Sequence, residues 1–113
     1  MYAKMENSKI AKAIKAVAAT ETTARFIAAN GHVKINYPFN SDPDTPLIKM
    51  IFPAEVLQPG AITVKLDNAK QLEYFGGACR IMAEKGNLII ESENLHCILP
   101  GTVRFPGIPT GGI

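Results

Sequence analysis

Two stretches of the chain, ARFIAANGHVKI at 24–35 and CRIMAEKGNLII at 79–90, lie 55 positions apart and share one pattern. In each, two apolar runs flank a turn dipeptide, Asn30-Gly31 in the first and Lys85-Gly86 in the second. Apolar runs on either side of such a dipeptide predict a β-hairpin. Four identities fall at matched positions: Arg25 with Arg80, Ala28 with Ala83, Gly31 with Gly86, and Ile35 with Ile90. These matches indicate that the chain contains an internal repeat.

A helix is expected before each hairpin. The segment SKIAKAIKAVAA at 8–19 is amphipathic, with Ser8 as its N-cap, and a second helix is expected at 67–76. An alternative runs the first helix on to Asn30 and ends it at Gly31. The alternation of apolar and polar residues from 33 to 37 favours the hairpin instead.

The remaining segments complete two similar halves, about 1–56 and 57–100. Each half then has the order strand, helix, strand, strand, strand. The other expected strands are Tyr2–Met5, LIKMIF at 47–52, AITVKL at 61–66 and LHCIL at 95–99, with a connection from Pro53 to Pro59. We expect 47–52 and 95–99 to be sheet edges. Residues 101–113 are rich in proline and glycine and predict an extended tail.

Composition excludes several classes of protein. The 113 residues are 47% hydrophobic and 19% charged, which excludes a disordered chain. No apolar run approaches the roughly 18 residues of a membrane span. The first ten residues contain no apolar stretch like that of a signal peptide. We expect a cytoplasmic protein in which Cys79 and Cys97 are reduced core residues.

Residues with catalytic or metal-binding potential are few. His96 and Cys97 are adjacent on a predicted strand, so their side chains point to opposite faces and cannot form a dyad. His32 stands beside a turn glycine without a nucleophile motif. Asp42 and Asp44 have the spacing of a metal loop but lack further ligands. We therefore expect no enzyme, no metal and no cofactor.

Positive charge is concentrated at the N-terminus. Residues 1–20 hold four lysines and one glutamate, although the net charge of the whole chain is only +2. Lys9, Lys12 and Lys15 occupy the polar half of the predicted helix at 8–19, without a carboxylate among them. This pattern fits either a solvated helix face or a surface for a polyanion.

Three segments resemble the DNA sliding clamps of the bacterial β-clamp and proliferating cell nuclear antigen type. They are SKIAKAIKAVAA at 8–19, PGAITVKLDNAKQLEYF at 59–75 and GNLIIESENLHCILPGTVRFP at 86–106. The resemblance implies an α+β, clamp-like domain with antiparallel sheets outside and two helices on one face. It also implies that Lys9, Lys12, Lys15 and Lys70 contact duplex DNA without reading its sequence.

The same resemblance implies assembly and function. Known clamps have two or three such domains per chain and six in a ring, whereas this sequence supplies one. We therefore expect a homo-oligomer joined at its sheet edges, acting without catalysis as a processivity or tethering factor in DNA replication.

Two alternatives stay open. The segment Gln71–Phe75 is similar to the glutamine-led peptide by which partners dock into clamps, although Leu72 and Phe75 also fit a buried helix face. The chain could instead be a small interaction module, such as a viral accessory protein, that modulates a replication or transcription protein. It would act through a sheet edge or the apolar residues Val103, Phe105 and Ile108.

Overall fold

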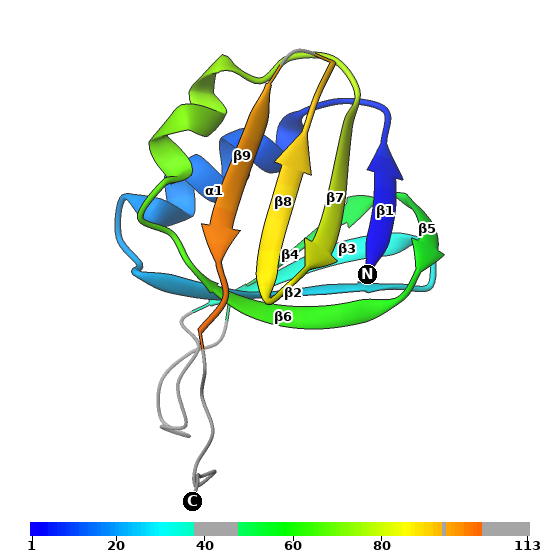
Figure 1. Ribbon diagram of the computed structural model, residues 1–113, viewed down its shortest axis with the longest axis horizontal. Helices are drawn as coiled ribbons and strands as arrows, with labels where there is room; N and C mark the ends of the chain where they lie inside the picture. The colour runs from blue at the N-terminus through cyan, green and yellow to red at the C-terminus, as the bar shows by residue number, and fades with distance from the viewer. Residues whose placement is uncertain (38–47, 94, 103–113) are drawn as a thin grey trace, which may run out of the picture.

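A computed structural model describes residues 1–37, 48–93 and 95–102, which form two antiparallel sheets and two helices (Figure 1). The elements in chain order are β1 (Tyr2–Met5), α1 (Lys9–Ala18), β2 (Thr23–Ala29), β3 (His32–Tyr37), β4 (Ile48–Pro53), β5 (Glu55–Gln58), β6 (Gly60–Lys65), the 3₁₀-helix η1 (Ala69–Tyr74), β7 (Cys79–Glu84), β8 (Asn87–Glu91) and β9 (His96–Pro100). Most of the tail expected at 101–113 lies outside the described residues.

Both predicted hairpins are confirmed, and their turns have the same backbone geometry. Asn30 and Gly31 have φ of 52° and 77°, and Lys85 and Gly86 have φ of 52° and 80°. Two successive positive φ angles make a type I′ turn, whose twist matches that of the flanking strands. The strand registers repeat as well: Arg25 pairs with Asn36, and Arg80 pairs with Glu91, 55 positions later.

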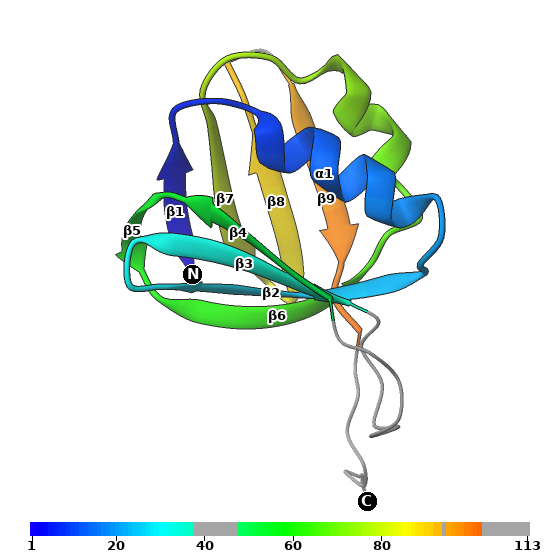
Figure 2. The same ribbon diagram turned by 180° about the vertical axis from the view of Figure 1, so that it is seen from behind.

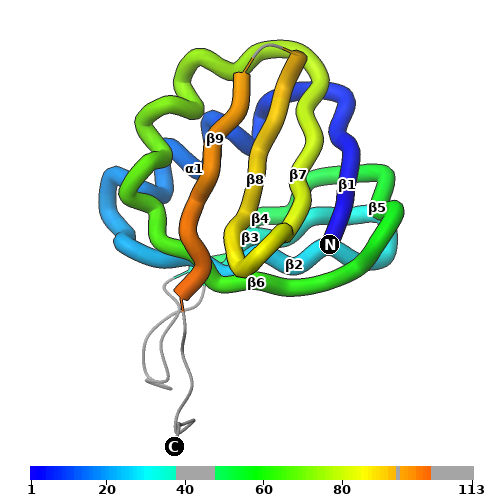
Figure 3. The backbone as a smooth tube through the Cα atoms, in the orientation of Figure 1, coloured from blue at the N-terminus to red at the C-terminus, as the bar shows by residue number. Residues whose placement is uncertain are grey.

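The two halves exchange their first strands. The five-stranded sheet has the order β5-β1-β7-β8-β9 and the four-stranded sheet the order β4-β3-β2-β6. Figure 3 shows the result, since the N-terminal strand β1 lies beside β7 from the second half of the chain. The strands of one sheet cross those of the other, and α1 and η1 pack against each other along the remaining side (Figure 2).

The start of α1 differs from its prediction in one detail. Ser8 occupies the N-cap position, but its side chain makes no capping hydrogen bond. Its hydroxyl donates instead to the carbonyl oxygen of Gly77, 2.5 Å away, which ties the start of α1 to the segment before β7. The side-chain oxygen of Asn7 accepts from the backbone N–H of Lys9 at 3.0 Å and satisfies one of the free donors of the first turn.

The predicted second helix, 67–76, is corrected to the six-residue 3₁₀-helix η1. Its inward side chains are nonetheless those of the predicted buried face, since Ala69 and Leu72 are fully buried and Phe75 is 4% exposed. Leu72 and Phe75 therefore belong to the core, which argues against a clamp-docking peptide at Gln71–Phe75.

Strand pairing explains why the second helix is short. Met5 at the end of β1 stands opposite Cys79, and Val64 in β6 stands opposite Ala24. Between these equivalent positions lie 18 residues in the first half and only 14 in the second. Four residues correspond to about one α-helical turn. The second connection therefore winds more tightly over fewer residues.

The expected connection from Pro53 to Pro59 contains a strand, β5, which pairs with β1 at the edge of the five-stranded sheet. The prediction that 47–52 and 95–99 form edges is confirmed, because β4 and β9 are terminal strands. Beyond β9, Gly101 forms a bridge with Val64, and the backbone N–H of Thr102 donates to the carbonyl of Thr63. This short contact links the two sheets.

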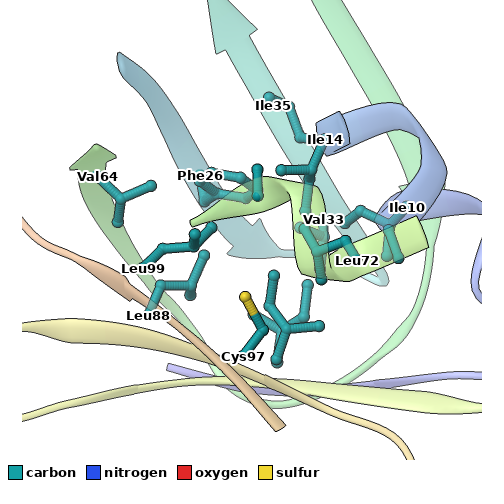
Figure 4. Packing of buried hydrophobic residues seen from close by; sticks show 14 of the residues in the cluster. Ile10, Ile14, Phe26, Val33, Ile35, Val64, Leu72, Leu88, Cys97 and Leu99 are labelled. Carbon is teal, nitrogen blue, oxygen red and sulfur yellow. The ribbon is translucent and has the colours of Figure 1, made fainter. Parts of the chain in front are cut away.

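The core fills the space between the sheets and the helix pair (Figure 4). Side chains from every layer meet there, including Ile10, Ile14, Phe26, Val33, Ile35, Val64, Leu72, Leu88, Cys97 and Leu99. Cys79 and Cys97 are free and buried, as expected for core cysteines. Within the described part of the chain, no helix is long and apolar enough to cross a membrane.

Candidate nucleic-acid interface

The outer face of α1 is a row of lysines. Ile10, Ile14 and Val17 are buried, which sets the rotation of the helix about its own axis. Lys9, Lys12 and Lys15 are therefore exposed. Positions three apart are neighbours on a helix surface, and their like charges repel by a few tenths of a kcal/mol. No acidic side chain stands in the first turn of α1 to offset them. An anion bound along this face would relieve that repulsion.

The fourth predicted lysine, Lys70, lies on η1. In a 3₁₀-helix, residues three apart stand one above the other, so Lys70 and Glu73 share an outward stripe. Both are exposed. Helix η1 packs against α1 (Figure 2), and the contact of Glu73 with Lys15 places this stripe beside the lysines of α1. The structure thus brings the four predicted lysines to the same pair of helices.

One ion pair modifies this surface. The Lys15 ammonium donates a hydrogen bond to a carboxylate oxygen of Glu73, with 2.6 Å between Nζ and Oε2. The hydrogen bond and the charge of Lys15 lower the pKa of Glu73 below its usual value. The sequence analysis did not anticipate this contact between Glu73 and Lys15. The two partners are 58 positions apart, so no local spacing could have revealed the pair.

The remaining lysines keep their charge uncompensated. Within the described residues, Lys9, Lys12 and Lys70 have no ion pair. We call these three residues together with Lys15 the helix lysines. An exposed group of ammonium ions without a fixed geometry suits phosphate contact, which carries no sequence information.

No metal or nucleophile site accompanies the helix lysines in residues 1–37, 48–93 and 95–102. That part of the chain holds no cluster of three potential metal ligands. His96 Nδ1 lies 2.8 Å from Glu91 Oε2 on the far side of the five-stranded sheet. Burial raises the pKa of the Cys79 and Cys97 thiols, which keeps them protonated and unreactive at neutral pH.

A hollow of about 630 Å³ opens between the β1–α1 turn and the β4–β5 corner. Met5, Ile10 and Phe52 contribute apolar walls. Its exposed charged groups balance in number, since the lining includes two lysines and two glutamates: Lys4, Lys9, Glu6 and Glu55. The hollow therefore does not extend the cationic surface of the helices.

Comparison with known proteins gives a clear answer for the fold. No protein-family model matches the sequence, and no curated protein matches it either. Among solved structures, the Helicobacter pylori β clamp in complex with 5-chloroisatin superposes with a TM-score of 0.72 at 13% identity, covering 96% of this chain and 33% of the clamp chain. The same clamp in complex with carprofen gives 0.71 at 14% identity, covering 97% and 32%.

The DNA polymerase III subunit beta from Pseudomonas aeruginosa gives a TM-score of 0.70 at 14% identity, covering 98% of this chain and 33% of that subunit. This chain thus spans about a third of the length of the clamps that it matches. At such low identity the likeness shows the fold alone. The chain forms a clamp-like α+β domain, as the sequence segments predicted.

Proposed function

We propose that this clamp-like domain is a non-catalytic DNA-tethering or processivity factor that contacts duplex DNA through the helix lysines. The observation that carries the proposal is the lysine row of α1, which has no acidic residue in its first turn and lies on a domain with the clamp fold. Phosphate contacts are equivalent at every step along a duplex, so such a surface can hold DNA and still slide.

We further propose that copies of the domain join edge to edge. Strands β4 and β9 form sheet edges, and each carries exposed isoleucine. Ile51 on β4 is 55% exposed and Ile98 on β9 is 43% exposed. Covering both features in one contact removes an aggregation hazard, and a repeated head-to-tail contact closes into a ring when its rotation allows.

Crosslinking tests the DNA contact. Because Cys79 and Cys97 are 2% and 1% exposed, a cysteine introduced by Lys12→Cys is the preferred target for a thiol-specific crosslinker carried by duplex DNA. The matched control is Glu84→Cys, an exposed position on the outer face of the five-stranded sheet. We expect DNA adducts at position 12 and few at position 84. Adducts at 84 with none at 12 would refute the role of the helix lysines.

Salt dependence gives a second measurement. Each phosphate contact contributes a slope of about −0.9 in log affinity against log salt for duplex DNA. Lys9→Gln combined with Lys12→Gln should therefore flatten the slope by about 1.8. An unchanged slope would mean that these residues are merely a solvated face.

The exposed edges also support a second candidate, in which a partner protein adds a strand to β4 or β9 and the domain acts as an interaction module. Light scattering distinguishes the two. Edge-to-edge assembly predicts a mass that rises with concentration in multiples of 12.2 kDa, and loss of that rise in Ile98→Glu. A constant mass of one chain at all concentrations would exclude self-assembly and favour the interaction module.

A further inference from the structure

The outer face of the four-stranded sheet carries a second group of cations. Strand alternation directs Ala24, Phe26 and Ala28 into the core and turns the intervening residues outward. Register then aligns the outward side chains in rows across the sheet: Lys49, Asn36, Arg25 and Thr63 in one row, Ile51, Lys34, Ile27 and Ala61 in the next, and Thr23 with Lys65 on the other side. We call Lys34, Lys49 and Lys65 the sheet lysines.

This face has no compensating negative charge within the described strands. The outward positions of β2, β3, β4 and β6 include no aspartate or glutamate. The sheet lysines have no ion pair in the described residues. Arg25 stands among them but has an interaction of its own, so the proposed surface consists of the three lysines.

The outer face of the other sheet provides the contrast. There, Arg80 Nη2 lies 3.3 Å from Glu91 Oε1, and His96 contacts the other oxygen of the same carboxylate. Glu84 adds a further exposed acid. Charges on that sheet are mixed in the ordinary way, whereas the four-stranded sheet presents positive charge alone. The asymmetry indicates a polyanionic partner for the four-stranded sheet.

The spacing of the sheet lysines suits a double helix. Strands lie about 4.8 Å apart and alternate residues of one strand about 6.8 Å apart, so the backbone positions of the three lysines spread over roughly 15 Å of the sheet surface. Duplex DNA carries one negative charge per about 1.7 Å of its axis, so several phosphates fall within this span. Asn36 and Thr63 stand in the same row as Lys49 and offer neutral donors for phosphate oxygens.

The inward placement of the aromatic residues argues against other partners. The aromatic residues of this sheet, Phe26, Tyr37 and Phe52, all pack into or against the core. Within the described strands of this sheet, no Phe, Tyr or Trp ring therefore remains outside for stacking on the bases of a single strand. An aromatic anchor of the kind that dominates protein interfaces is missing for the same reason.

We propose that the outer face of the four-stranded sheet binds the phosphate backbone of duplex DNA through Lys34, Lys49 and Lys65. This surface faces away from the core, which separates it from the helix lysines on α1 and η1. One protomer could then contact two duplex segments at once. The inference goes beyond the proposed function and does not depend on it, because different residues form the two surfaces.

The test compares two double variants that remove equal charge. Lys34→Gln with Lys49→Gln alters the proposed surface, and Lys4→Gln with Lys85→Gln removes two exposed cations from the five-stranded sheet and its turn. Glutamine keeps most of the aliphatic stem, and thermal melting confirms that each variant is folded. Affinity for a mixed-sequence duplex is measured by fluorescence anisotropy between about 50 and about 200 mM salt.

We expect the sheet variant to flatten the salt slope by about 1.8, so that its loss of affinity over this salt range is about 12-fold smaller than that of the wild type. The control variant should change the slope far less. Equal changes in the two variants, or none in the sheet variant, would overturn the proposal. So would a sheet variant that loses binding to polyglutamate while its DNA slope is unchanged, because the face would then serve an acidic protein.

Lys9→Gln with Lys12→Gln is measured in parallel. A slope that depends only on this helix variant refutes the sheet surface and leaves the proposed function intact. A slope that depends only on the sheet variant supports the sheet surface and removes the basis of the proposed function.

Discussion

Glu73 should weaken DNA binding by the helix face, and its removal should strengthen it. The Glu73 carboxylate lies 2.6 Å from the Lys15 ammonium and occupies the donor that the proposed phosphate contact requires. Both side chains are nearly half exposed, at 45% for Lys15 and 42% for Glu73, so the pair contributes little to folding. Glu73→Gln removes the negative charge but keeps a polar side chain of similar shape.

The size of the effect follows from counting one phosphate contact. In the wild type, Lys15 must exchange one anionic partner for another, which releases little net charge. In Glu73→Gln it should add a full contact and steepen the salt slope by about 0.9. The loss of affinity between about 50 and about 200 mM salt should then be about 3.5-fold larger than in the wild type. Consistently, Lys15→Gln should have a larger effect in the Glu73→Gln background than in the wild type.

The assay is the same anisotropy titration on four proteins: wild type, each single variant and the double variant. Glu84→Gln is the matched control, because it removes an exposed acid from the five-stranded sheet and lies away from the helix pair. We expect it to leave the slope nearly unchanged. If Glu73→Gln and Glu84→Gln raise affinity equally, only net charge matters. If neither changes the slope, Lys15 does not contact phosphate.

Four further outcomes can be measured. Because Lys15 lowers the pKa of Glu73, the ion pair should persist as the pH falls to the ordinary value of about 4.5 and break below it. The free energy of unfolding of Glu73→Gln should therefore fall less steeply with pH than that of the wild type, and only in that acidic range. Leu72→Ala should lower the free energy of unfolding by about 2–5 kcal/mol in urea titrations, since Leu72 is fully buried. Gly101→Ala would place a methyl group on the carbonyl oxygen of a neighbouring turn and should cost about 1–3 kcal/mol, whereas Gly76→Ala meets nothing and should be nearly neutral. The Cys79 thiol, whose pKa burial raises, should alkylate slowly in the native protein and rapidly in urea.

The hairpins were predictable because their signals are local. Asn30-Gly31 and Lys85-Gly86 adopt the positive φ angles that such dipeptides favour, and alternation within about six residues on each side sets the register. Once both hairpins are placed, the 55-residue repeat follows. The resemblance to clamps then rested on the order of elements, which the superposed structures support at the level of the fold.

The second helix and β5 were mispredicted for tertiary reasons. Residues 67–76 have the composition of an α-helix, but the connection between paired positions of β6 and β7 is four residues shorter than its counterpart. The strand at 55–58 lies between Pro53 and Pro59, which locally indicate a loop. Proline is tolerated on edge strands, and β5 forms only because β1, some 50 residues earlier, offers a free edge.

The candidate surfaces differ in how much the sequence reveals of them. Three helix lysines follow from one amphipathic segment, whereas the sheet lysines come from three separate strands and form a group only when register aligns those strands. Each strand alone shows one outward cation, which is unremarkable on any exposed strand. A net charge of +2 conceals this arrangement, because cations gather on two faces while acids such as Glu84 and Glu91 stand on the other sheet. Since polyanions respond to the local density of charge, the pairing register of the strands, more than the overall composition, determines where the proposed DNA contacts lie.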